Sequence, residues 1–117
     1  MTSTLERAVE PNEIVAALSR YGLRQRDIAA AAAVTERTVY SWKRAQPDLR
    51  DKHYDRLAAI RDIVLILQDS LTNRGVGQWL RAQNRLLDGE RPLAVLAMGN
   101  VDEVRRAAQA FAEGVYL

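Results

Sequence analysis

Side chains able to contact nucleic acid gather in the segment 35–44. Arg37 and Arg44 each carry a planar guanidinium that can donate two hydrogen bonds to guanine O6 and N7, or bind a backbone phosphate. Tyr40 can contact a phosphate or a thymine methyl group. Val39 and Trp42 are three residues apart, which predicts that both face the core from one side of a helix. The candidate DNA-contacting residues are Gln25, Thr35, Glu36, Arg37, Tyr40, Ser41, Lys43 and Arg44.

Two short helices must position these side chains. The segments 24–32 and 35–45 predict a helix-turn-helix, whose second helix enters the major groove of double-stranded DNA. Thr35 is a typical N-cap for that second helix, and Gln25 begins the first, where a phosphate is commonly held. Ala33 stands in the turn where this motif often has glycine. A left-handed backbone there costs alanine about 1 kcal/mol, so we expect a slightly altered turn.

Composition narrows the classes of protein that the chain can be. The chain has 117 residues, 48% apolar content and a net charge of +2. Residues 20–62 hold ten Lys and Arg against six Asp and Glu, so the positive charge lies with the predicted DNA-binding segment,. Without cysteine, and with His53 as the single histidine, we expect no metal site, no cofactor and a reducing cytoplasm,. With no leader, long apolar run or catalytic motif, we expect neither a membrane protein nor an enzyme, and no small-molecule substrate.

Helical periodicity continues through the rest of the chain and predicts an all-α fold. We expect helices at 11–21, 51–71, 92–98 and 101–113, a short helix holding Trp79 and Leu80, and fraying over 1–10. The long helix 51–71 is either a strut between two halves, a dimer contact or a central core helix. Gly75 and Gly77 predict a break over 73–77. Asn100 followed by Glu103 predicts a capping box at the last helix.

The second half carries a longer motif. The pattern W-L-x-x-x-N-x-x-L-x-G-x-x-P-L-x-x-L-x-x-G runs from Trp79 to Gly99. It resembles the toxin-binding region of the Xre/MbcA/ParS-like antitoxins, and the chain end, Phe111 to Leu117, looks like the tail of the mycobacterial MbcA-type members. That family also has an N-terminal helix-turn-helix, so the resemblance covers nearly the whole chain. The spacing from tryptophan to glycine is fairly specific, whereas the helix-turn-helix alone is not.

The resemblance implies a protein partner. Antitoxins of this family pair with RES-domain toxins that deplete NAD, place their C-terminal end at the entrance of the toxin's active site, and look like autoregulators of their own promoter. The expected divisions are a DNA-binding unit over 1–50, a connecting helix over 51–72 and a toxin-binding unit with its tail over 73–117. The candidate toxin-contacting residues are Trp79, Arg81, Asn84, Arg85, Pro92, Phe111, Gly114, Val115, Tyr116 and Leu117.

Physical chemistry alone leaves alternatives open for this tail. An apolar terminus gains free energy from burial, at about 1.5–3 kcal/mol for a leucine side chain, and its free carboxylate would suit an anion site. Tyr116 and Leu117 can meet that need in a toxin's cleft or against their own core. The family resemblance implies that the chain is a type II antitoxin, and the helix-turn-helix predicts at least a dimer. The alternatives are a stand-alone repressor with a C-terminal dimerisation unit, or an antitoxin that has lost DNA binding.

Overall fold

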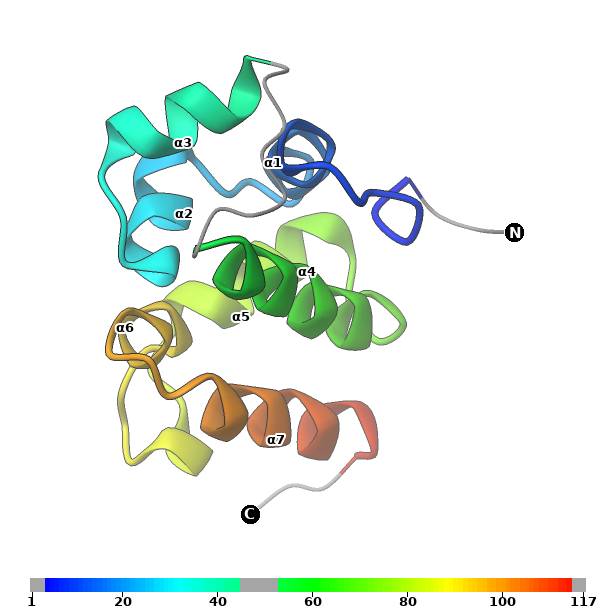
Figure 1. Ribbon diagram of the computed structural model, residues 1–117. Coiled ribbons are helices and arrows are strands. Elements are labelled where there is room, and N and C mark those ends of the chain that lie inside the picture. The colour runs from blue at the N-terminus through cyan, green and yellow to red at the C-terminus, as the bar shows by residue number, and fades with distance from the viewer. Residues whose placement is uncertain (1–3, 45–52, 115–117) are drawn as a thin grey trace.

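The computed structural model describes residues 4–44 and 53–114, and within these ranges the chain is all-helical. This confirms the predicted fold class. No helix in the described part is long and apolar enough to cross a membrane. Figure 1 shows α1–α3 grouped on one side of α4, with α6 and α7 on the other. The elements are α1 Pro11–Ser19, α2 Gln25–Ala32, α3 Glu36–Lys43, α4 Tyr54–Gln68, α5 Asn73–Arg81, the 3-10 helix η1 Arg85–Leu87, α6 Pro92–Ala97 and α7 Val101–Ala112.

Helix α4 lies at the centre of the molecule. It packs against α1 and α2 from the N-terminal half and against α5 and α7 from the C-terminal half. One continuous cluster of buried apolar side chains joins both halves through this helix. Of the three roles open to this helix, the structure supports the central core helix. Its buried side chains are Leu57, Ile60, Ile63, Val64 and Leu67.

The N-terminal segment is not frayed from residue 4 onward, so the expectation for 1–10 is wrong there. Leu5 and Ala8 are 1% and 2% exposed. The backbone around them is also tied to α4, because the Ala8 carbonyl accepts a hydrogen bond from Arg61 at 2.8 Å and the Val9 carbonyl accepts one from Tyr54 at 2.6 Å. Apolar burial and these long-range hydrogen bonds hold the segment, and neither is visible as a local pattern.

The turn between α2 and α3 has the left-handed backbone that its position requires. Ala33 has φ 57° and ψ 43°, so alanine adopts the conformation that glycine would favour,. Thr35 then caps α3, since its Oγ1 accepts the Thr38 backbone N–H at 3.2 Å. Val39 and Trp42 are buried, as their spacing predicted. The Thr35 cap is therefore confirmed, and the turn accommodates alanine at a local cost of about 1 kcal/mol.

The predicted break over residues 73–77 is wrong, because this segment forms the first half of α5. Thr72 begins the helix by accepting the Gly75 N–H on its Oγ1 at 3.0 Å. Gly77 is buried, and a Cβ there would lie 2.5 Å from the Tyr21 carbonyl oxygen. This glycine permits a close approach of α5 to the turn between α1 and α2, at some loss of helix propensity.

Substituting Gly77→Ala is therefore expected to destabilise the fold. The added methyl group would collide with backbone rather than with an adjustable side chain, so we expect an overpacking loss of about 1–3 kcal/mol in the free energy of unfolding. Urea denaturation measures it. Gln78→Ala, an exposed position on the same helix, is the control and should stay within about 0.5 kcal/mol,. Equal stability of the two variants would contradict the close approach.

Arg56 joins three helices at one point. From α4, its Nη1 donates to the Ala31 carbonyl in α2 at 3.3 Å and to the Leu96 carbonyl in α6 at 3.1 Å. Both carbonyls belong to helix C-termini, whose partial negative charge favours a cation. A Cβ at Gly99 would lie 3.0 Å from Nη2 of the same guanidinium. Arg56 thus satisfies carbonyls from both halves of the chain.

The predicted capping box at the last helix does not form. Asn100 occupies the N-cap position of α7, but its side chain makes no capping hydrogen bond and its backbone has φ −87° and ψ 59°. Asp102 instead accepts from Arg105 at 2.6 Å. The carboxylates of Asp102 and Glu103 lie in the first turn of α7, where negative charge interacts favourably with the helix dipole,.

Candidate functional site

The first candidate surface is the outer face of α3. Glu36, Arg37, Tyr40, Ser41, Lys43 and Arg44 are all exposed, while Val39 and Trp42 lie beneath them. The Arg44 guanidinium lies 5.8 Å from the centroid of the Tyr40 ring. Tyr40 is 53% exposed, which is high for a large aromatic side chain. The helix thus presents one polar and aromatic face to solvent, with two arginines that can reach a groove.

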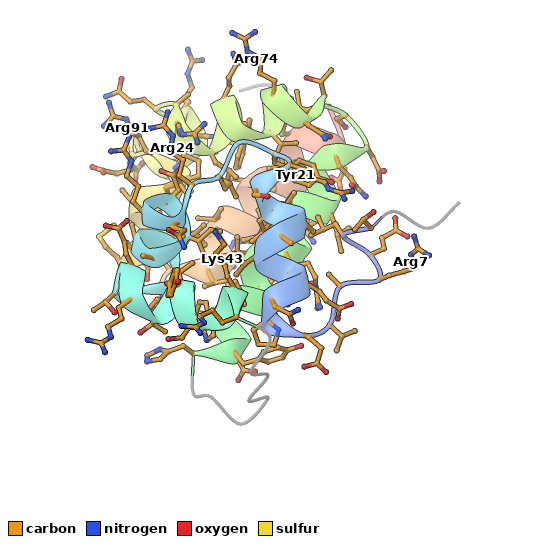
Figure 2. The ribbon with its side chains drawn as sticks, turned by 90° about the horizontal axis from the view of Figure 1, so that it is seen from above. Arg7, Tyr21, Arg24, Lys43, Arg74 and Arg91 are labelled. Carbon is orange, nitrogen blue, oxygen red and sulfur yellow. The ribbon has the colours of Figure 1, made fainter. Side chains whose placement is uncertain are left out.

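A groove of about 660 Å³ adjoins this face, between α1, the beginning of α2 and the end of α3. Its charged lining residues are Arg24 and Lys43, both cations, and Figure 2 labels both. Gln25 also lines the groove, and its Nε2 is buried without a hydrogen-bond partner. The structure therefore brings Gln25 together with Lys43. Sequence reasoning missed Arg24, although an arginine directly before a helix beginning with glutamine was a usable signal.

The second candidate surface is built from α5, η1, α6 and α7. Trp79 is half-buried and packs on Phe111 with ring centroids 6.3 Å apart. Asn84 shapes the loop that follows: its Oδ1 accepts the Leu86 N–H at 2.9 Å and its backbone N–H donates to the Glu90 carbonyl at 3.0 Å. Pro92 is buried at the first turn of α6. Three of the predicted toxin-contacting residues thus shape this unit by packing and backbone hydrogen bonds.

Two arginines of this unit, Arg81 and Arg85, were predicted to contact a toxin. Arg81, at the end of α5, donates from Nη2 to the Gly22 carbonyl and to Asp27 Oδ2, the latter at 3.0 Å. Both partners belong to the N-terminal half of the chain. Arg85 is exposed in η1. Arg81 thus contacts the N-terminal half of the chain, and the predicted toxin contact of Arg85 stays a prediction.

The end of the chain leaves α7 through a glycine. Phe111 is half-buried, and Gly114 is exposed with φ 78°, a left-handed conformation that ends the helix,. Val115, Tyr116 and Leu117 lie outside the described residues. Their predicted contact with a toxin stays a prediction.

Tyr21, which sequence reasoning did not single out, anchors the turn that Arg81 contacts. Its hydroxyl donates to Gln68 Oε1 at 2.7 Å, across α1 and α4. Burial raises the pKa of the Tyr21 phenol, an effect that Arg20 opposes and Glu6 reinforces. The folded chain therefore holds the phenol proton more firmly than the unfolded chain does.

This pKa shift predicts a loss of stability in alkali. The contribution of Tyr21 is complete below the ordinary tyrosine pKa near 10, and it is lost as the pH rises through the raised pKa,. Tyr21→Phe should lower the free energy of unfolding by about 1 kcal/mol at neutral pH, because the hydrogen bond to Gln68 is lost,. For this variant, the free energy of unfolding measured by urea denaturation should also fall less steeply with pH between about pH 9 and 11. An equal dependence of the free energy of unfolding on pH for the wild type and Tyr21→Phe would contradict the shift.

Comparison with known proteins decides the family. No family model matches the chain. The chain is 53% identical over 117 residues, covering all of both sequences, to the probable mycobacterial cidal antitoxin Rv3188 of Mycobacterium tuberculosis. This chain belongs to the mycobacterial cidal antitoxins. Membership in an antitoxin family agrees with the expectation that the chain is not an enzyme.

The antitoxin also has the fold of a solved relative. It superposes on a chain of the crystal structure of the M. tuberculosis MbcT–MbcA toxin–antitoxin complex with a TM-score of 0.76, covering 91% of this chain and 96% of that one. The sequences are 23% identical, so this likeness supports the fold. The family resemblance that began with the Trp79–Gly99 motif is thus confirmed by an independent full-length relative and by the arrangement of helices.

Proposed function

We propose that this antitoxin binds a RES-domain toxin and blocks its depletion of NAD. The observation that carries the proposal is the full-length identity to a probable cidal antitoxin, because it spans the C-terminal unit as well as the N-terminal helices. The solved relative comes from a toxin–antitoxin complex, which supports a protein partner of the same kind here. Neutralisation would be steric: the antitoxin occupies the substrate entrance, and no bond is made or broken on this chain.

The C-terminal unit has the features that such a block requires. Helix α7 packs on α4, α6 and η1, and the Trp79–Phe111 pair joins its C-terminal part to α5. Gly114 then ends the helix, and residues 115–117 are aliphatic or aromatic. We propose that these residues enter the toxin's substrate entrance and bury their side chains there.

Co-expression with the adjacent reading frame tests the partnership. An affinity tag at the N-terminus of this chain should bring a second protein through size-exclusion chromatography at a fixed ratio, and that protein alone should lower cellular NAD. A single species on the column, with no effect of the neighbour on NAD, would instead favour a stand-alone repressor. The measured mass would also give the stoichiometry, which we expect to include at least two copies of the antitoxin.

We propose binding to its own promoter as a second role, supported by the exposed face of α3. Arg37, Tyr40 and Arg44 lie on that face, and the adjoining groove carries Arg24 and Lys43. Cations on a helix face suit the phosphates and base edges of a major groove. Binding there would make the antitoxin a repressor of its own operon.

Arg44→Ala is expected to weaken promoter binding about tenfold, as for the loss of one base or phosphate contact. Fluorescence anisotropy on a promoter duplex, repeated at several salt concentrations, measures this loss. Arg106→Ala, which removes one exposed cation from α7, is the matched control and should bind DNA as the wild type does. Toxin capture should survive Arg44→Ala. Loss of both activities in Arg44→Ala would refute the division between a DNA-binding and a toxin-binding half. If the wild type itself causes no change in the anisotropy of the duplex, DNA binding has been lost.

A further inference from the structure

We propose that Arg81, a residue of the C-terminal unit, is a positioning residue for the DNA-binding half of the antitoxin. The inference deepens the proposed promoter binding and rests on it. It differs from the sequence expectation, which placed Arg81 on the toxin face. In this reading Arg81 contacts neither DNA nor toxin directly, and it acts through the beginning of α2.

The contacts of Arg81 all lie at one small joint. Its Nη2 donates both to the Gly22 carbonyl in the turn before α2 and to Asp27 Oδ2 in the first turn of that helix. The partners are 59 and 54 residues away along the chain. The Asp27 side chain is 16% exposed and that of Arg81 is 41% exposed, so the pair is partly shielded from solvent.

Asp27 carries the effect of Arg81 to the helix end. The same Oδ2 that accepts from Arg81 also accepts the Arg24 backbone N–H, at 2.8 Å, which closes the first turn of α2. A carboxylate held by two donors has a defined direction, whereas one held by a single donor can rotate. Arg81 therefore orients the cap that fixes where α2 begins.

The beginning of α2 is also where the DNA-binding half offers its phosphate contacts. Arg24 and Gln25 line the groove that Lys43 borders from α3. Backbone N–H groups at a helix N-terminus bind phosphate only when the first turn is held in place. A shift of this turn would misplace Arg24 and Gln25 together relative to the outer face of α3.

The packing around Arg81 supports a rigid joint. Gly77, one helical turn earlier in α5, lets the helix approach the Tyr21 carbonyl, and a Cβ at Gly77 would also lie 3.1 Å from Arg81 Nη1. Tyr21 is in turn bound to α4 through Gln68. The turn between α1 and α2 is thus held by α4 and α5 together, so the C-terminal unit sets the geometry of the N-terminal one.

The decisive experiment compares Arg81→Ala with Arg74→Ala. Arg74 lies on the same helix and projects outward (Figure 2), so this control removes an equal charge without touching the joint. For Arg81→Ala we expect promoter affinity about three- to tenfold lower, with an unchanged slope of log K against log salt. A direct phosphate contact would instead reduce that slope by about 0.9, and finding such a reduction would overturn the proposal.

A second measurement does not depend on DNA. Hydrogen exchange on the free antitoxin should become about tenfold faster for the amides of the first turn of α2 in Arg81→Ala, and should be unchanged in Arg74→Ala. If the wild type fails to bind DNA, promoter binding is wrong, and the exchange data still decide whether Arg81 positions α2. Unchanged exchange would overturn the inference, as would a selective loss of toxin capture, which would return Arg81 to the toxin interface.

A double-mutant cycle tests the route through Asp27. The effects of Arg81→Ala and Asp27→Asn on exchange and on DNA affinity should be clearly less than additive, because each variant breaks the same contact. Additive effects would show that Arg81 does not act through Asp27.

Discussion

Removing Tyr116 and Leu117 is expected to abolish inhibition of the toxin while leaving the helical fold intact. Both residues follow Gly114, where α7 has already ended. Burial of the leucine side chain alone contributes about 1.5–3 kcal/mol, and tyrosine adds apolar area and a directed hydroxyl. A combined loss of about 3 kcal/mol corresponds to roughly a hundredfold weaker complex. Calorimetric titration and NAD consumption by the toxin measure the two effects.

Substitutions separate the apolar character of the tail from its length. Tyr116→Ser combined with Leu117→Ser keeps the chain length, so it should inhibit as poorly as the deletion because apolar burial is lost. Full inhibition by this variant would show that the apolar side chains are not required. Full inhibition by the truncated chain would end the proposal that the tail blocks the substrate entrance, and circular dichroism would confirm that each variant is folded.

Arg56→Ala is expected to be the most destabilising single change outside the apolar core. The guanidinium serves the Ala31 and Leu96 carbonyls, at the C-terminal ends of α2 and α6. The Leu96 carbonyl would keep the Gly99 N–H at 2.9 Å, so the cost falls on the Ala31 carbonyl and on the two lost hydrogen bonds from a charged group. We expect the free energy of unfolding to fall by about 2–3 kcal/mol. Urea denaturation should show a lower midpoint with an unchanged slope.

Two further variants make this prediction specific. Arg56→Lys keeps the charge, but the lysine side chain is one bond shorter than the path to Nη1, the atom that donates both hydrogen bonds, so the loss should be intermediate,. Arg106→Ala removes an exposed arginine and should change stability by no more than about 0.5 kcal/mol,. A loss for Arg56→Ala as small as that of Arg106→Ala would mean that the Ala31 carbonyl finds another donor.

Local signals in the sequence predicted local structure well. Thr35 caps the helix it precedes, because a side chain and the backbone N–H group three residues later are neighbours in any helical turn,. Val39 and Trp42 are buried for the equally local reason of helical periodicity,. The same reasoning failed at Asn100, where the backbone before α7 leaves the side chain without a cap contact.

Two of the wrong predictions share one physical cause. Gly75 and Gly77 predicted a break between helices, but Gly77 lies inside a helix at a point where the Tyr21 backbone leaves no room for a Cβ. The first ten residues were predicted to be frayed, but Leu5 and Ala8 are buried in the apolar core together with side chains of α1 and α4. In both places a tertiary contact outweighed the local preference, and such contacts leave no periodic trace.

The amino-acid sequence by itself determined the helical class, the helix cap at Thr35 and, through the Trp79–Gly99 motif, the antitoxin family. The helical class and the cap depend on residues that are close in sequence, and the family depends on a sequence motif that can be recognised without a structure. Only the tertiary structure decided the surroundings of Arg56 and Arg81. Their partners lie 25 to 59 residues away, and an arginine can serve a phosphate, a toxin or a helix end equally well until folding brings one of them within reach.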